Sequence, residues 1–431
     1  MNMIISAKIE RSVLVLIFLL AYNAGIAQQH NLSLEQCQKE VQETFPLHKG
    51  KELLGKSSLL NIENLKAANL PKLYANGKLS YQSDVTGISF SGMNTPKAPK
   101  DQYSLNVDIE QLIYDGGKTK HRVNVEKKAA DVDIQNLEIQ MYQLRERVNI
   151  AFFSIQLVRK NKEVLLDKQK TILQRIKLVK SAVENGAVLP ANLKILESEL
   201  LLIKQQFMEL NAIESSSFNV LSQLMGRSVD IKTELEQTSF NENIVADISI
   251  QSKNRPEYKW YASQQFLLDA QKDLLKKDRY PVIKGFGQMG YGNPGYNQLT
   301  DKFDTYYMLG AKVSWQIFDW KTNRRKQKAI LIQKNLIETK ELGFTQNQLI
   351  DSGRKSNEIQ KFKILLQQDD AIIELHEDIS KSSASQLDNG VITSSDYLDD
   401  LNKEIQAKLN KEYHAIQLQQ SLAEYKRIQG I

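Results

Sequence analysis

The side chains that carry most enzyme chemistry are few in this chain and are not grouped. The sequence has no phosphate-binding glycine loop, no dinucleotide fingerprint and no nucleophile elbow. None of the five histidines shows metal-ligand spacing; they are His30, His48, His121, His376 and His414. We therefore predict no catalytic residue, no metal and no cofactor, and no residue supports an exported enzyme.

Composition and charge restrict the class of protein further. The 431 residues carry a net charge of +6, and the basic residues are scattered among nearly as many acids, which argues against nucleic-acid binding. The one tight basic cluster, residues 321–328, follows directly on Trp320 and indicates a membrane edge or a solvated face. The single cysteine, Cys37, can form no internal disulfide.

The N-terminus is organised as a secretory signal. Lys8 and Arg11 precede an apolar run over 13–21, and small residues at 25–27 provide a cleavage position. An N-terminal membrane anchor is the alternative, but the run is well short of the roughly 20 residues that a spanning helix needs. We predict a signal peptide over 1–27.

The rest of the chain contains the same unit twice. Residues 210 positions apart match as Pro46, Pro71, Gly77 and Tyr81 with Pro256, Pro281, Gly287 and Tyr291. Residues 204 positions apart match as Tyr103, Leu105, Tyr114, Asp115, Asn185 and Gly186 with Tyr307, Leu309, Phe318, Asp319, Asn389 and Gly390. The interval is constant at 210 and then constant at 204, which indicates a duplicated unit with one loop of variable length. We place the first repeat at 28–226, an inter-repeat equatorial segment at 227–253 and the second repeat at 254–431.

Long helices are predicted to make up most of each repeat. Apolar residues recur in heptads along the column Leu137, Leu144, Ala151, Val158, Leu165, Ile172 and Val179. After an N-terminal helix, we predict helices over about 118–185 and 190–225, and again over about 321–389 and 394–428. The first would be roughly 100 Å long and must therefore pack along similar helices. The seam of the second repeat is weaker, and its polar stretch over 351–358 is not explained by the pattern.

Each pair of helices is preceded by two predicted strands. Apolar and polar residues alternate over about 72–82 and 103–113, and over about 282–291 and 306–318. A half-buried strand of a soluble sheet has the same pattern. Aromatic residues at or near the strand ends favour strands that span a bilayer. Four strands cannot close a barrel and an open edge is not stable in lipid, so the chain must assemble, and three copies would supply twelve strands.

The residues at the element boundaries resemble those of one family. These residues are Leu32-Ser33-Leu34-Glu35-Gln36, Asn254-Arg255-Pro256-Glu257, the segments 68–81 and 277–291, Tyr114-Asp115-Gly116-Gly117 and Phe318-Asp319-Trp320. In this order, and doubled, they resemble TolC-type outer-membrane efflux proteins over essentially the whole mature sequence. The resemblance implies a homotrimer with a twelve-stranded β-barrel in the outer membrane, continuous with a periplasmic tunnel of helices.

The same resemblance implies a function and a set of partners. The chain would be the passive exit duct of a tripartite efflux or type I secretion system, gated at the periplasmic helix tips. It would contact outer-membrane lipid and a periplasmic adaptor protein, and through that adaptor an inner-membrane transporter. The tip turns that would meet the adaptor contain Asn185, Gly186, Pro190, Asn389 and Gly390. The sequence does not identify the exported substrate.

The match to the family's tip pattern implies an aperture made by Asp396 and Asp399. The two carboxylates are one helical turn apart and would form two stacked rings after threefold assembly, which favours cations. The plainer alternative is that Asp396 caps a helix that begins near Ser394. The places of the family's polar lock fall on Leu387, Ile392, Ala191 and Asn192, so basic and aromatic partners are expected to be absent and hydrophobic tip packing is a candidate.

A second hypothesis, from a different class of protein, is a periplasmic coiled-coil scaffold or adaptor without a pore. Such proteins also have long helical hairpins. They would not need two copies of a strand pair of bilayer length. Release from membranes by high salt or carbonate would favour this second hypothesis.

Overall fold

The computed structural model describes residues 31–87, 92, 97–238 and 253–431. The predicted signal peptide over 1–27 lies outside these residues, as does most of the inter-repeat segment. The helices are α2 (Leu34–Thr44), α3 (His48–Ala67), α4 (Lys118–Glu184), α5 (Pro190–Met225), α6 (Pro256–Lys276), the short 3-10 helix η2 (Lys277–Arg279), α7 (Thr322–Asp388) and α8 (Ser394–Gln429). The strands are β1 (Lys72–Tyr81), β2 (Asp101–Tyr114), β3 (Val282–Asn293) and β4 (Asp304–Ser314).

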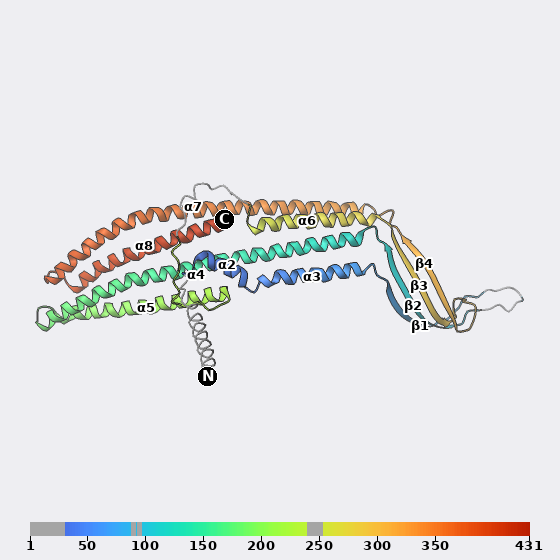
Figure 1. Cartoon of the computed structure of the whole chain (residues 1–431), viewed down its shortest axis with the longest axis horizontal. Coiled ribbons are helices and arrows are strands. Elements are labelled where there is room, and N and C mark those ends of the chain that lie inside the picture. Colours follow the sequence, from blue (N-terminus) through green and yellow to red (C-terminus); the bar gives the residue numbers. More distant parts are fainter. Residues whose placement is uncertain (1–30, 88–91, 93–96, 239–252) are drawn as a thin grey trace, which may run out of the picture. The chain divides into compact units, whose positions relative to one another are not determined.

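The order of these elements repeats, as Figure 1 shows. Two strands, a helix of 67 residues and a helix of 36 residues occur twice. The predicted fold class, dominated by helices with a duplicated strand–strand–helix–helix unit, is confirmed. Judged by length and apolar character together, no helix in the described ranges could cross a membrane.

The chain divides into two compact units. The first contains Met1–His48, Gln140–Arg255 and Gln346–Ile431, and the second contains Lys49–Ile139 and Pro256–Thr345. The boundary passes through α4 and α7, so each long helix contributes to both units.

The helical hairpin of α4 and α5 in the first unit is closed by an apolar seam. Leu165 and Ile172 of α4 are buried together with Leu196 and Ile203 of α5. The seam also contains an ion pair between Lys168 and Glu199, whose side chains are only 6% and 12% exposed. The heptad column is therefore the buried face of α4, as coiled-coil packing requires.

The hairpin of α7 and α8 has a more polar seam, which explains the stretch over 351–358. Ser352 is fully buried, and its hydroxyl accepts a hydrogen bond of 3.2 Å from the side chain of Gln429 near the end of α8. The side chain of Gln348 donates to the carbonyl of Ile428 at 2.6 Å. Small polar residues on α7 thus allow the last turn of α8 to pack closely and satisfy its free carbonyl groups.

The strands of the second unit form one antiparallel sheet in the order β1-β2-β3-β4. The central pair joins the two repeats, with Val107 opposite Met289. The strands contribute one apolar face, which contains Leu73, Leu79, Tyr103, Leu105, Val107, Ile109, Met289, Tyr291, Tyr307, Leu309 and Val313, all exposed. Leu309, for example, is 77% exposed. No described element covers this face, so the alternating pattern does not place its apolar residues in a protein core.

The strands pass into the long helices through matched turns. Asp115 accepts hydrogen bonds from the backbone N–H groups of Gly117 and Thr119, and Asp319 accepts the same two bonds from Lys321 and Asn323. Each aspartate therefore caps the first turn of its helix. The predicted strand over about 306–318 extends four residues beyond the end of β4. The ladder stops at the Val282–Ser314 pair because the residue before Val282 is a proline, which has no N–H to donate.

Candidate functional site at the helix tips

Two turns of the same construction close the helical hairpins of the first unit. After α4, the side chain of Asn185 donates to the carbonyl of Ser181 at 2.9 Å, and Gly186 has φ 72°. After α7, Asn389 donates to the carbonyl of Ser385 at 2.8 Å, and Gly390 has φ 70°. The glycines are required because few other residues adopt this left-handed conformation. The predicted turn residues therefore lie at the tips of the hairpins.

The second helix of each hairpin begins differently. Pro190 is the first residue of α5, and no side chain caps that end. At the start of α8, Thr393 and Asp396 form a capping box: the backbone N–H of Asp396 donates to the Thr393 hydroxyl, and the N–H of Thr393 donates to Asp396 Oδ2 at 3.0 Å. The expected capping role of Asp396 is present in the protomer.

Asp396 stays charged in this position. The side-chain and backbone hydrogen bonds from Thr393 hold the pKa of Asp396 below its ordinary value. Its side chain is exposed, so the second carboxylate oxygen is free to face solvent or an aperture. A capping role and a role in an aperture are therefore compatible.

Asp399 lies one turn further along α8 and has a different partner. It accepts a hydrogen bond of 2.6 Å from Lys403, four residues on, and both side chains are exposed. The next residue, Asp400, accepts a hydrogen bond from Ser383 of α7. Within one protomer the structure therefore gives Asp396 and Asp399 separate partners on one helix.

Polar contacts tie the tip of one hairpin to the tip of the other. Arg175 of α4 forms an ion pair with Asp388, the last residue of α7. Its guanidinium carbon also lies 5.2 Å from the ring centroid of Tyr397 on α8, which is 2% exposed. A third contact joins Asn192, whose side-chain oxygen accepts the backbone N–H of Ser394 at 2.9 Å.

These contacts correct the expectation that basic and aromatic partners are absent at the tips. That expectation is wrong because the partners come from other positions: Arg175 lies well inside α4, and Tyr397 lies in the first turn of α8. No spacing in the sequence identifies Arg175 as a contact residue, since an isolated arginine on a helix is ordinarily exposed to solvent. The expected hydrophobic tip packing is also present, with Leu387 buried and Ile392 packed against the same cluster.

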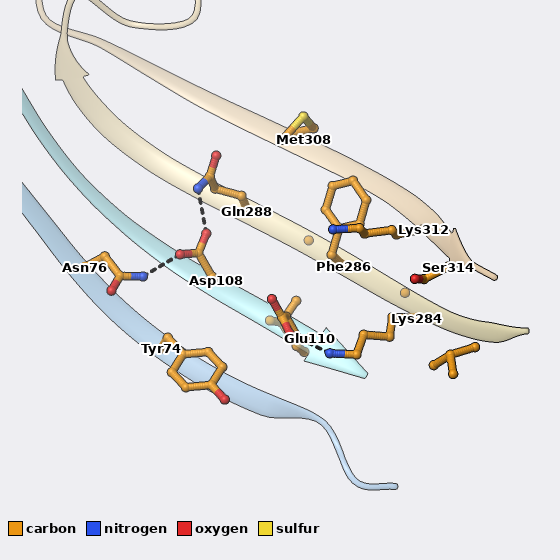
Figure 2. Close-up of a pocket in the computed structure, with 14 residues that line it drawn as sticks. Tyr74, Asn76, Asp108, Glu110, Lys284, Phe286, Gln288, Met308, Lys312 and Ser314 are labelled. Atoms are coloured by element: carbon orange, nitrogen blue, oxygen red, sulfur yellow. Dashed lines mark hydrogen bonds and ion pairs between the residues drawn. The ribbon is translucent and has the colours of Figure 1, made fainter. Parts of the chain in front are cut away.

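A second polar arrangement lies on the face of the sheet opposite the apolar one, and Figure 2 shows it. Asp108 of β2 accepts hydrogen bonds from Asn76 of β1 at 2.5 Å, from Asn106 at 2.6 Å and from Gln288 of β3 at 2.6 Å. Glu110 and Lys284 approach to 3.7 Å beside it. Apart from Asn106, these residues line an open recess of about 640 Å³.

The same recess is shaped by one close aromatic contact. Phe286 of β3 covers Gly310 of β4, where a Cβ atom would lie 2.5 Å from the ring. Glycine is therefore needed at this position so that the ring can lie flat against the strand. The polar face is thus a hydrogen-bonded, wettable surface, in contrast to the opposite face of the same strands.

The structure offers no arrangement for metal or redox chemistry in the part it describes. No three His, Cys, Asp or Glu side chains among those residues are grouped as a metal site. Cys37 is fully buried in α2, and burial raises the pKa of its thiol to about 12. A thiol in this state is neutral and unreactive at physiological pH.

Comparisons with known proteins found one matching family model and several similar structures. Residues 56–227 match the family model of the outer membrane efflux protein. The outer-membrane channel OprN has a similar structure, with a TM-score of 0.68 and 13% identity over 92% of this chain and 89% of that one. The outer membrane protein VceC of Vibrio cholerae matches with a TM-score of 0.65 and 12% identity over 92% of this chain and 96% of that one.

A third solved structure is the open state of the outer membrane channel MtrE of Neisseria gonorrhoeae. It matches with a TM-score of 0.62 and 14% identity over 92% of this chain and 88% of that one. The comparison with curated protein sequences found no match.

Proposed function

We propose that this chain is a member of the outer membrane efflux protein family, whose model matches residues 56–227, and that three copies form a passive exit channel in the outer membrane. The family and its structural neighbours are channel proteins rather than enzymes, and they belong to the outer membrane. In the proposed trimer, three four-stranded sheets close a twelve-stranded barrel, and the helical hairpins form the periplasmic tunnel.

The observation that supports this proposal is the unfinished sheet. Its apolar face is exposed along all four strands, while its other face is polar. β1 and β4 are the outer strands of the described sheet, so each has one edge without a partner strand. Lipid would accept the apolar face but not the open edges, because unpaired backbone groups are costly in hydrocarbon. Closure with other copies satisfies both conditions.

The helical tips are the proposed contact with a periplasmic adaptor. The turns that contain Asn185, Gly186, Pro190, Asn389 and Gly390 join the two helices of each hairpin. The family implies an adaptor and an inner-membrane pump. In this proposal the energy for transport is supplied by that pump.

The proposed aperture is formed by Asp396 and Asp399 from three protomers. The charge of Asp396 is maintained because its pKa is lowered by Thr393. The charge of Asp399 is partly compensated by Lys403. We therefore expect the Asp396 ring to contribute more to cation preference than the Asp399 ring.

The closed state is held, in this proposal, by the contacts between the two hairpins of each protomer. Opening must separate the tips, which breaks the Arg175–Asp388 ion pair and the bond from Ser394 to Asn192. Arg175 must also leave the ring of Tyr397.

Two measurements test the proposed channel. Membrane fractionation comes first: a channel stays with the outer membrane in carbonate, whereas release into the soluble fraction would favour a periplasmic scaffold. Conductance of the purified protein in planar bilayers comes second, with Asp396→Asn and Asp399→Asn as single and double variants. We expect the cation preference to fall, most strongly with Asp396→Asn.

The matched control for these variants is Asp167→Asn. Asp167 is an exposed acid on α4 with a lysine partner three residues away, so it resembles Asp399 in charge and surroundings. Unchanged selectivity in the Asp396 and Asp399 double variant would remove the aperture assignment. A stable monomer without conductance would remove the channel itself.

A further inference from the structure

A basic recess is lined by residues at the end of α6, in η2 and near the start of α7. Figure 1 shows α6 and α7, the two long elements that contribute to it. The recess has a volume of about 410 Å³ and is lined by Lys276, Arg279, Arg324 and Gln327. Three of these four side chains are cations, and the three cations are exposed. The recess therefore concentrates positive charge at one point of the strand-to-helix junction.

The two arginines of this recess have no acidic partner among the residues that the structure describes. Lys276 forms an ion pair of 2.7 Å with Asp273, and the nearby Asp278 pairs with Lys118 at 3.0 Å. Within the described ranges, no carboxylate lies in ion-pair distance of the guanidinium of Arg279 or of Arg324. Two adjacent, unpaired guanidinium groups favour binding of an anion, and their planar forks match a phosphate.

The segment between β4 and α7, which leads into the helix that carries Arg324, contains exposed aromatic and apolar residues. The indole N–H of Trp315 donates to the carbonyl of Arg279 at 3.0 Å, which fixes the tryptophan beside the recess. Ile317, Phe318 and Trp320 follow, all strongly exposed, and the rings of Phe318 and Trp320 are 4.9 Å apart. The apolar face of β4 therefore ends in a group of aromatic side chains next to the cations, the composition that is typical of a membrane–water interface.

The backbone at this junction adopts a conformation that favours glycine. Trp320 has φ 52° and Lys321 has φ 60°, whereas the equivalent residues of the first repeat are Gly116 and Gly117, with φ 68° and 83°. The second repeat therefore presents a tryptophan and a lysine on a turn that the first repeat builds from glycines.

The pair of arginines in the recess is particular to the second repeat, whereas Lys276 has a counterpart in Lys66. At the intervals that relate the two repeats, Arg279 corresponds to Asn69, Arg324 to Lys120 and Gln327 to Val123. Asn69 is already engaged, because its side-chain oxygen lies 3.4 Å from the hydroxyl of Thr119. The first repeat thus lacks the pair of guanidinium groups at the same place in its fold.

We propose that this recess binds the phosphate of a phospholipid headgroup in the membrane leaflet that faces the periplasm. The proposal rests on the proposed function, because the sheet must lie in the membrane for the recess to meet that leaflet. Arg279 and Arg324 hold the phosphate, while Trp315 and Trp320 lie among the acyl chains and glycerol groups above it. One such site per protomer would fix the depth of the barrel in the bilayer.

The test measures lipid binding to the purified protein in detergent by native mass spectrometry. The probes are dioleoylphosphatidylglycerol, dioleoylglycerol, which has the same chains without a phosphate, and inorganic phosphate as a competitor. We expect phosphatidylglycerol to bind and dioleoylglycerol not to bind at the same site. Each basic side chain near an anionic headgroup strengthens binding about fivefold, so the variant Arg279→Gln/Arg324→Gln should bind roughly 25-fold more weakly.

The matched control is Lys326→Gln/Lys328→Gln, which removes the same charge from exposed positions on α7 that do not line the recess. It should retain binding, and the single variant Arg324→Gln should lie between the parent and the double variant. Equal binding by the arginine variant and its parent would overturn the inference. Equal binding of dioleoylglycerol, or displacement of the lipid by inorganic phosphate, would overturn it too.

Conductance of the same preparations separates this inference from the proposed function. A protein that forms pores but shows no dependence of lipid binding on the arginines would contradict the lipid site alone. A protein that forms no pores would contradict the channel, whatever lipid it binds.

Discussion

Replacing Arg175 by methionine should favour the open state of the channel. Arg175 connects the two hairpins at their tips through the ion pair with Asp388 and the contact with the ring of Tyr397. Asp388 is half exposed, so the ion pair contributes about 1 kcal/mol. The ring is buried, and a cation over such a ring contributes about 1 kcal/mol more. The loss of about 2 kcal/mol per protomer corresponds to a roughly 30-fold shift toward separated tips.

Single-channel recording in planar bilayers measures this shift as the fraction of time that the channel conducts. Arg175→Met should raise that fraction strongly. Arg175→Lys should have a smaller effect, since it keeps the charge but loses the planar group that lies over the ring. The control is Lys170→Met, because Lys170 pairs with an acid on its own helix and both partners are exposed.

Two results would refute the reasoning about Arg175. The first is an open fraction for Arg175→Met that equals that of the parent or of Lys170→Met. The second comes from a double-mutant cycle with Asp388→Asn, in which a coupled pair requires the second substitution to add little once Arg175 is gone. Full additivity of the two effects would show that the ion pair does not hold the tips together.

Two further predictions concern stability. Ser352→Leu should lower the free energy of unfolding by about 1–3 kcal/mol, because it places a large side chain at a fully buried position against the end of α8. Thermal melts measure this loss. The control is Ser382→Leu at an exposed position, which should have little effect. Burial alone would raise the pKa of Glu214, but hydrogen bonds from Arg159 and Lys162 lower it below its ordinary value of 4.5. The contribution of Glu214 to stability is therefore present above about pH 4.5 and is lost as the pH falls through the lower folded-state pKa. Glu214→Gln should therefore make stability fall less steeply at acid pH. An unchanged fall in stability at acid pH would contradict this assignment.

The long helices and the apolar strand face could be predicted because both depend on a local period. A seven-residue spacing is sufficient to place Leu165, Ile172 and Val179 on one face of α4, and all three are buried. Alternation is sufficient to place Leu105 and Leu309 on one face of the sheet. The pairing of β2 with β3 was not predictable in the same way, because it joins residues far apart in the chain. The bond from Gln288 to Asp108, for example, joins residues 180 positions apart.

The candidate site was predicted only where the backbone determines the residue type. Gly186 and Gly390 mark the tips because their left-handed conformation requires them. Arg175 could not be identified, because its partner Asp388 lies 213 positions away and only the packing of two hairpins brings them together. The capping role of Asp396 is local and follows from Thr393 three residues before it, while a ring of three carboxylates depends on assembly and stays a prediction.

The two repeats differ at a turn whose left-handed backbone favours glycine. The glycines at the tips are kept in both repeats, but the left-handed pair at the strand-to-helix junction is glycine only in the first. A non-glycine residue in this conformation costs about 1–2 kcal/mol, so Trp320 and Lys321 must be offset by their surroundings. The structure provides part of that compensation, because Arg325 donates to the carbonyl of Trp320 at 2.9 Å and the indole packs edge-on against Phe318. These contacts hold the strained turn, but they do not bury the indole, which stays 78% exposed. An exposed tryptophan held on a strained turn, at the junction that also carries Arg324, has the amphipathic character that favours the edge of a bilayer.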